Sequence, residues 1–395
     1  MNSDSRKQTI KLFLSKGYQL DEKALNFIIE NPNKEGEIID FLKKTQPKTS
    51  TLAYGDIVKI FETEEVKLEI LKSPQIIEKP YSPNTILSYL NARYDFIKNI
   101  LQKRIELTNL TSINKIGRAK QFSLIVLIRE IDHVNKSLVV DDRTGSTKLF
   151  VEDAEKIQYL IKDEAVGLVC KQDDNKITAS KILHPDTLIK REITKTKNTI
   201  TCIFLSDFNL DHNINQQFYE NYKKWCKELD GESTWVFILG GISKDVKHNE
   251  EFIKYLPKQS KKVIFENSIL HEHENPISIG DPSFIRLGGI TLFLSQGRFL
   301  KKYESIFTSK LEEMLVNLIK TRHLNPTFDA NNHLYKSDPY TLDIIPDIIA
   351  VGSSGIPKSL NYKGITVLTT GSFLTQPIFW SINLQTRETL KIDFT

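Results

Sequence analysis

The sequence predicts an α+β protein of several domains: a short helical module, a small β-barrel and a layered α/β domain. Three observations carry this prediction. Apolar residues recur at helical spacing over residues 5–42, and five short strand-like runs follow one another over 123–183. After residue 198 a strand, a helix and a second strand succeed each other. A chain of 395 residues is also longer than one ordinary domain.

The composition is that of a globular protein without a strong charge preference. Hydrophobic residues make up 39% and charged residues 26%, and the formal net charge is +4. This balance permits nucleic-acid contact without requiring it. No apolar run approaches the roughly 20 residues of a membrane-spanning helix, and the polar start is not a signal peptide, so we expect a cytoplasmic protein. Cys170, Cys202 and Cys226 are unevenly spaced, which favours buried free thiols.

Residues 1–45 are predicted to form the helical module, either as a mini-domain or as a docking element. Phe13 lies in one apolar repeat, and Asp21 is placed to cap a second helix that carries Ile28. Residues 46–85 are rich in proline, hydroxyl and charged residues, so we expect a flexible linker. Alternation over 58–70 leaves a short hairpin or a partner-bound strand within it as an alternative.

Residues 86–190 are predicted to form a helix followed by an OB-type barrel. The helix over 86–105 places Arg93 and other basic residues on a solvated face. The five strand-like runs are 123–131, 136–141, 147–151, 165–171 and 176–183, with turn residues at 141–145. The aromatic residues Phe122 and Phe150 and the basic residues Lys115, Arg118 and Lys120 leave a single-strand-binding barrel and an architectural barrel both open.

Residues 198–395 are predicted to form the layered α/β domain. The apolar run 201–205 delivers Asp207 to a loop, a helix covers 216–229, and a second strand over 234–239 ends at Gly240 and Gly241. This order predicts parallel pairing of the two strands. The acidic loop at a strand end is a position where metal ligands gather in phosphoesterases.

Six segments together carry a resemblance to a known family. The chain resembles the small subunit of the archaeal D-family DNA polymerase, which is related to the B-subunits of eukaryotic replicative polymerases. The most specific match is the basic segment that contains Arg-His-Leu-x-Pro. The matching segments are 16–20, 93–104, 142–145, 320–327, 346–352 and 364–376.

The resemblance implies an OB fold and a calcineurin-like phosphoesterase domain, whose active relatives are metal-dependent 3′→5′ exonucleases. Carried over one at a time, the family's metal motifs are degenerate in this chain. Asp-x-His becomes Asp207 with Asn209, and the bridging Asp becomes Gly241. The family's His-Gly becomes Gln296-Gly297. At the positions of the family's Gly-Asn-His-Asp and Gly-His-x-His motifs, this chain has Asn267, Ser268, Ile269, Ser353 and Gly355.

Two cations need many oxygen and nitrogen ligands, so we expect neither metal nor catalysis in this domain. The resemblance implies a non-catalytic, nucleoid-associated subunit that binds the large catalytic subunit. DNA is then contacted through the complex, and the partner subunit uses Mg or Mn. The sliding clamp and other replication proteins are further candidate partners. One alternative is an exonuclease rebuilt around Asp207, Asp211, His271 and His273, and another is a stand-alone nucleic-acid-binding paralogue. His323 is predicted to be a hydrogen-bonded packing residue, and His212, His248 and His333 to lie in loops.

Overall fold

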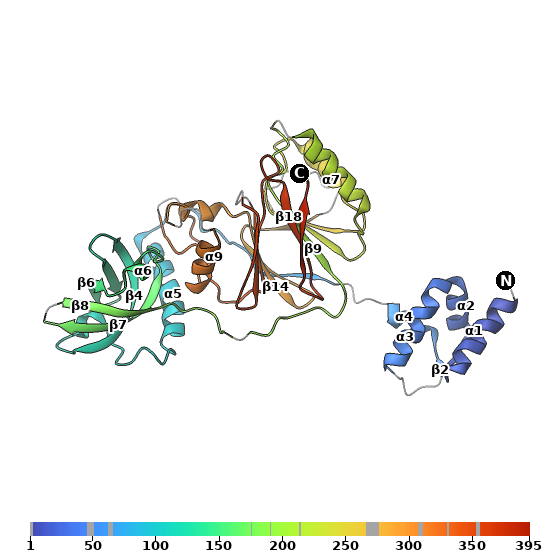
Figure 1. Cartoon of the computed structure of the whole chain (residues 1–395), viewed down its shortest axis with the longest axis horizontal. Helices are drawn as coiled ribbons and strands as arrows, with labels where there is room; N and C mark the ends of the chain where they lie inside the picture. The colour runs from blue at the N-terminus through green and yellow to red at the C-terminus, as the bar shows by residue number, and fades with distance from the viewer. Residues whose placement is uncertain are drawn as a thin grey trace. The chain divides into compact units, whose positions relative to one another are not determined.

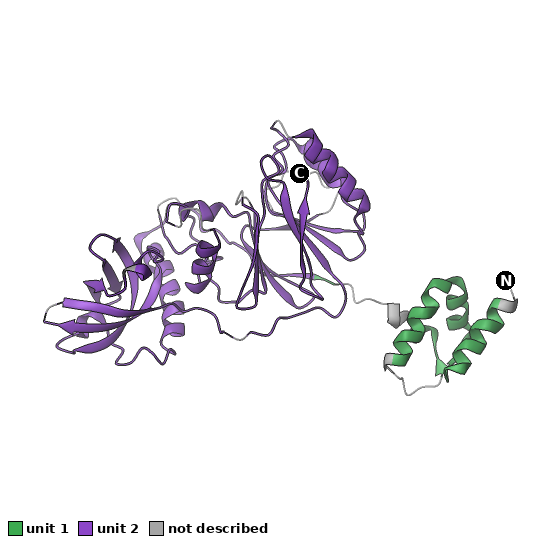
Figure 2. Cartoon of the chain, in the orientation of Figure 1, with its two compact units in different colours: residues 1–67 green, residues 68–395 purple. Residues whose placement is uncertain are grey.

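The computed structural model forms two compact units, residues 1–67 and residues 68–395 (Figure 2). Within the described part of the chain, no helix is both long and apolar enough to span a membrane. All three cysteines are free and buried, as expected from the sequence. The structure describes residues 3–45, 51–61, 66–174, 176–189, 191–212, 215–265, 276–306, 311–329, 332–352 and 356–395.

The first unit is a helical module with its own core. Its helices are α1 (Ser3–Ser15), α2 (Glu22–Glu30), η1 (Pro32–Lys34), α3 (Glu35–Thr45) and α4 (Tyr54–Phe61), and its strands β1 (Gln19–Leu20) and β2 (Thr51–Leu52) pair in parallel. Asp21 caps α2 by accepting from the Ala24 N–H at 2.6 Å, and it also accepts from the Tyr54 N–H at 3.0 Å. Leu52 and Ile57 are buried against Phe13 and Ile28. Part of the expected linker therefore belongs to this core.

The linker prediction is also wrong at β3 (Leu68–Lys72). This strand pairs antiparallel with β13 (Ser283–Leu287) and forms the edge of a six-stranded sheet. The alternation of residues in 66–70 did indicate a strand. Its partner lies more than 200 residues along the chain, so local spacing alone favoured a linker.

The barrel is closed by five strands in the order β4-β5-β6-β8-β7. Helix α5 (Pro83–Leu101) precedes it and is capped by Ser82, whose hydroxyl accepts from the Thr85 N–H at 3.1 Å. The hairpin turn is confirmed, because Asp142 Oδ1 accepts from the backbone N–H groups of Thr144 and Gly145. The barrel elements are β4 (Gln121–Asp132), β5 (Ser137–Asp142), β6 (Gly145–Val151), α6 (Ala154–Ile157), β7 (Ala165–Asp173) and β8 (Lys176–Leu183), with η2 (Ile113–Lys115) before them.

The rest of the second unit contains two six-stranded sheets, which Figure 1 shows beside each other. The first has the order β12-β11-β10-β9-β18-β19 and is covered by α7 and α8, while the second has the order β16-β17-β15-β14-β13-β3 and packs against α9. The predicted parallel pairing of β9 with β10 is confirmed, with Phe204 opposite Phe237.

These elements have the following bounds. In the first sheet and its helices they are β9 (Thr201–Leu205), α7 (Gln216–Glu228), β10 (Thr234–Ile238), α8 (Val246–Tyr255), β11 (Lys261–Phe265), β12 (Ile277–Ile279), β18 (Ile378–Asn383) and β19 (Thr389–Asp393). In the second they are β14 (Ile290–Ser295), η4 (Arg298–Lys302), α9 (Leu311–Lys320), β15 (Ile348–Val351), β16 (Lys358–Tyr362) and β17 (Ile365–Thr369). The mixed α/β organisation expected from the sequence is observed.

Candidate functional site

Four loops meet where parallel strands of the two sheets end. They follow β9, β10, β14 and β15 and carry Asp207, Gly240, Gly297 and Gly352. A Cβ added at Gly240 would lie 2.7 Å from Asp207 Oδ1, and one added at Gly352 would lie 2.5 Å from the Leu239 carbonyl oxygen. A Cβ at Gly297 would lie 2.2 Å from the Gly352 carbonyl oxygen. The structure therefore brings together positions that the sequence had assigned to one degenerate centre.

The Asp207 loop is held in a constrained backbone conformation. Asp207 and Asn209 have φ angles of 51° and 46°, in the left-handed region that Asp and Asn adopt more readily than other non-glycine residues. Phe208 between them is fully buried, with its ring centroid 4.1 Å from that of Phe252 and 4.6 Å from that of Phe373. The Phe373 N–H also donates to the Asp207 carbonyl oxygen at 3.1 Å. Apolar packing thus fixes the loop on which Asp207 stands.

The described side chains around these strand ends are a poor match for a dinuclear metal centre. Besides Asp207, the loops after β9 and β14 carry the amides Asn209 and Gln296, and amides are weaker metal ligands than imidazoles. Gly241 has no side chain, and a Cβ there would meet only Asn209 Oδ1, at 3.9 Å. In the described part of the chain, no group of three or more His, Cys, Asp or Glu residues is placed to hold a metal. Asn267, Ser268, Ile269, His271, His273, Ser353 and Gly355 lie outside the described residues.

Asp281 is a carboxylate near these strand ends that sequence reasoning missed. Its Oδ1 accepts from the Ser295 hydroxyl at 2.9 Å and from the Gln296 N–H at 3.0 Å. Burial raises the pKa of Asp281. These bonds hold the loop after β14 in place. No sequence signal marks Asp281, because it belongs to a different loop from the residues it binds.

Asp211, a member of the alternative centre, is bound to the loop after β10. Asp211 accepts from the Ser243 hydroxyl at 2.5 Å and from the Lys244 N–H at 2.6 Å, and these bonds lower the pKa of its carboxyl group. His248 lies on helix α8, so its expected loop position is wrong. His212 and His248 line a separate hollow of about 480 Å³ beside Tyr219.

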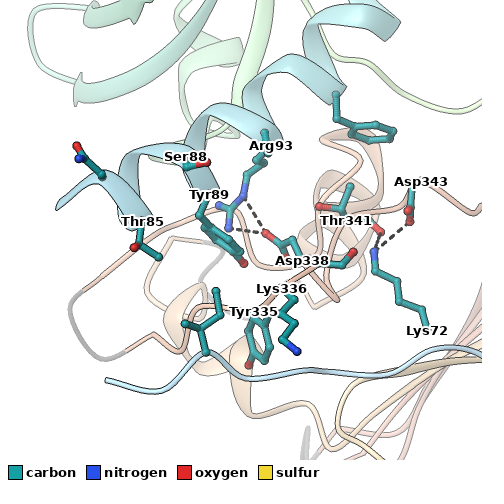
Figure 3. A pocket seen from close by; sticks show the side chains of 15 residues that line it. Lys72, Thr85, Ser88, Tyr89, Arg93, Tyr335, Lys336, Asp338, Thr341 and Asp343 are labelled. Atoms are coloured by element: carbon teal, nitrogen blue, oxygen red, sulfur yellow. Dashed lines mark hydrogen bonds and ion pairs between the residues drawn. The ribbon is translucent and has the colours of Figure 1, made fainter. Parts of the chain in front are cut away.

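A larger hollow, of about 650 Å³, lies between helix α5 and the loop before β15 (Figure 3). At its base Arg93 is 8% exposed, so the expected solvated position on α5 is wrong. The guanidinium donates from Nε and Nη2 to Asp338 Oδ2, at 3.1 and 2.8 Å, and from Nη1 to the Pro326 carbonyl oxygen at 2.6 Å. Burial lowers the pKa of Arg93, but the Asp338 carboxylate outweighs it and raises the pKa overall.

His323 completes this buried network and confirms the prediction of a hydrogen-bonded packing residue. Its Nδ1 accepts from the Asn325 N–H at 3.1 Å, so the neutral ring carries its proton on Nε2 and donates to Asp338 Oδ2 at 2.9 Å. Burial, aided by the nearby Arg93 charge, lowers the pKa of His323 to about 4. Asp338 stays ionised, because His323 and Arg93 lower its pKa despite burial. Tyr89 lies beside the pair, and burial raises the pKa of its hydroxyl.

Comparison with known proteins gives two similar chains. The DNA polymerase II small subunit of Archaeoglobus fulgidus is 21% identical and aligns over 93% of this chain and 91% of its own. The protein of the same name from Methanothermobacter thermautotrophicus is 20% identical over 75% and 74%. No family model matches the chain. The solved structure of an archaeal phosphodiesterase covers 49% of this chain and 99% of its own at 13% identity, with a TM-score of 0.31 that is too low to assign a fold.

The Arg-His-Leu-x-Pro segment, which suggested the resemblance, is the one that provides His323 to the network at Arg93. As these motifs predicted, the chain is similar along nearly its whole length to the archaeal DNA polymerase II small subunit.

Proposed function

We propose that this chain is the small subunit of a replicative DNA polymerase and that it binds and stabilises the large catalytic subunit without hydrolysing DNA itself. The names and coverage of its two relatives support the polymerase role. One observation carries the non-catalytic part. Asp207 faces glycines where a second cation-binding carboxylate would be needed, and amides stand at Asn209 and Gln296.

The contacts within the second unit support this scaffolding role. Polar contacts, one of them buried, join the barrel and the preceding helix to the segment 326–338 of the layered domain. Arg93 on α5 binds Asp338, the Thr327 hydroxyl donates to the Lys162 carbonyl oxygen at 3.1 Å, and the Phe328 N–H donates to Asp163 Oδ2 at 3.1 Å. We propose that the closed barrel is an OB fold, and that barrel and sheets together present one preformed surface to the large subunit. Preformed surfaces bind with little ordering cost.

Metal use follows from the same reasoning. Polymerase chemistry uses divalent cations, and in our proposal these are Mg or Mn bound by the large subunit. The four strand-end loops of this chain then keep their shape through packing and hydrogen bonds, since the residues at these positions do not fit a dinuclear centre. DNA synthesis accordingly belongs to the complex.

Co-expression with the large subunit from the same organism tests the proposal. We expect the two chains to co-purify, and we expect the isolated small subunit to leave single-stranded DNA intact in the presence of manganese. Asp207→Ala serves as the control, and it should change neither result. Manganese-dependent degradation that Asp207→Ala abolishes would show an active exonuclease instead. Failure to co-purify would point to a stand-alone protein.

A further inference from the structure

Two hollows of the second unit share part of their lining, and we refer to them together as the track. The 650 Å³ hollow between α5 and the loop 335–343 contains Tyr89, Arg93 and Tyr335, and the same three residues line a second hollow of about 200 Å³. The volume of the larger hollow is within the range that is typical of ligand sites. The second hollow begins at Arg298, directly after the Gln296-Gly297 loop of the degenerate centre.

Aromatic rings recur along this track. Tyr335 is partly exposed in both hollows, with its ring centroid 6.5 Å from that of Tyr340, and Tyr340 packs edge-on against Phe299. The Ile77 N–H donates to the Leu334 carbonyl oxygen at 2.8 Å, which ties the backbone next to Tyr335 to the segment before α5. A partly exposed aromatic ring is a platform onto which a base can stack.

Cations outnumber carboxylates on the walls. The cations are Lys72, Arg93, Arg298, Lys302 and Lys336, and the carboxylates are Asp338 and Asp343. Lys72 and Arg93 are bound to those two carboxylates, and Lys302 pairs with Asp329 outside the walls. Arg298 and Lys336 are exposed and have no carboxylate within 4 Å among the described residues. The track therefore presents two cations without an ion pair to a described residue, although the Arg298 charge also acts on the buried Asp281, whose pKa it lowers against the effect of burial.

Hydroxyl and amide groups line the same track. Asn84, Thr85 and Ser88 on the first turns of α5 and Ser337 on the loop before β15 line the larger hollow. Figure 3 shows Thr85 and Ser88 on α5. These hydroxyl and amide groups can donate to sugar and phosphate oxygens without selecting a base sequence. A purely apolar ligand would use only part of this lining.

We propose that this track binds single-stranded nucleic acid, with a base stacked on Tyr335 and neighbouring phosphates at Arg298 and Lys336. The combination of a stacking ring with exposed cations is what sequence-tolerant single-strand binding requires. Arg93 and Asp338 form the neutral floor of the site, because each compensates the charge of the other. The proposal extends the proposed function, since it gives the small subunit a direct contact with a strand at the polymerase.

The test uses the full-length chain and a fluorescein-labelled (dT)₂₀ strand, followed by fluorescence anisotropy. The double variant Arg298→Ala/Lys336→Ala should weaken binding about tenfold or more. The slope of log K against log[salt] should become less negative by roughly 1.4, because two phosphate contacts to a single strand are lost. Tyr335→Ala should weaken binding about fivefold or more, and Tyr335→Phe, which keeps the ring, should not.

A matched control removes the same charge elsewhere. Lys224→Ala/Lys227→Ala on α7 alters two exposed lysines outside the track and should leave binding unchanged. Lys115→Ala/Arg118→Ala tests the barrel as the competing surface. Binding that is absent in the wild-type protein, or that only the barrel variant weakens, would overturn the proposal.

Co-purification with the large subunit separates this inference from the proposed function. We expect the track variants to lose affinity for the strand while they still co-purify. Variants that lose the large subunit but keep the strand would identify the track as a protein-docking surface and would overturn the nucleic-acid proposal.

Discussion

The buried pair of Arg93 and Asp338 gives the sharpest stability prediction. Both side chains are nearly inaccessible, with exposures of 7% and 10%, and Asp338 Oδ2 accepts from two guanidinium nitrogens of Arg93. Asp338→Asn keeps the size of the side chain but removes its charge, which leaves a buried guanidinium uncompensated. Breaking a buried pair in this way costs about 3–5 kcal/mol. A loss of that size is a large part of the 5–15 kcal/mol that typically stabilise a domain.

A double-mutant cycle isolates the interaction itself. Arg93→Met should cost a similar amount, because the buried Asp338 carboxylate then keeps neutral donors such as His323 Nε2 and the Tyr340 N–H but loses the cation that compensates its charge. Combining the two substitutions removes both charges, so the double variant should be about 2 kcal/mol more stable than the sum of the single losses predicts. The free energy of unfolding is measured in urea by tryptophan fluorescence. All three tryptophans, Trp225, Trp235 and Trp380, lie in the second unit.

The control is an exposed pair in the same unit. Arg286 donates to Glu69 at 3.0 Å across β13 and β3, and its side chain is 45% exposed. Arg286→Met should therefore cost less than about 1 kcal/mol. If Asp338→Asn cost no more than this control, or if the effects of Arg93→Met and Asp338→Asn were simply additive, the assigned role of the network would be refuted.

Three further predictions concern the same unit. Because the folded pKa of His323 is about 4 and an unfolded histidine titrates near 6.5, the unfolded state binds more protons between these values. The free energy of unfolding should fall as the pH drops from 6.5 to 4, and urea melts of His323→Gln should lack most of this dependence. Gly240→Ala should lower the melting temperature by calorimetry, since its Cβ would lie 2.7 Å from Asp207 Oδ1, whereas Gly241→Ala should not. Burial raises the pKa of Cys170 and Cys226 to about 12, so a thiol reagent should label them only after urea unfolds the protein.

The local sequence pattern was sufficient to predict an element wherever the residues that define that element are close together in the sequence. The strands of the barrel, the Asp142 turn and the strand that ends before Asp207 all follow from residues within a few positions of one another. The same reasoning placed Asp207 beside Gly240, because parallel neighbours end at the same edge of a sheet. Apolar spacing also identified the first helices of the N-terminal module.

Long-range pairing explains what the sequence could not show. In the sequence, Arg93 is one of several basic residues on α5. Only the fold shows that it is buried, because it binds Asp338, which lies 245 positions away. The sequence predicted a linker in place of strand β3 for the same reason, because β3 pairs with β13, which lies far away in the sequence. Asp281 was missed because its partners belong to another loop. In each case the deciding contact joins segments whose proximity no local periodicity encodes.

The glycine contacts explain how these strand ends hold together with so few ionic ligands. At Gly297 and Gly352 the backbones of neighbouring loops approach so closely that no Cβ would fit, and Gly240 lies equally close to the Asp207 loop. Phe208, buried beneath that loop, fixes it from the apolar side. Backbone contact and aromatic packing act over short distances and need no cation, so they can maintain the geometry of the loops by themselves. In the described residues, the contacts that fix the shape of these loops are therefore contacts of backbone and aromatic rings, which do not depend on a bound cation.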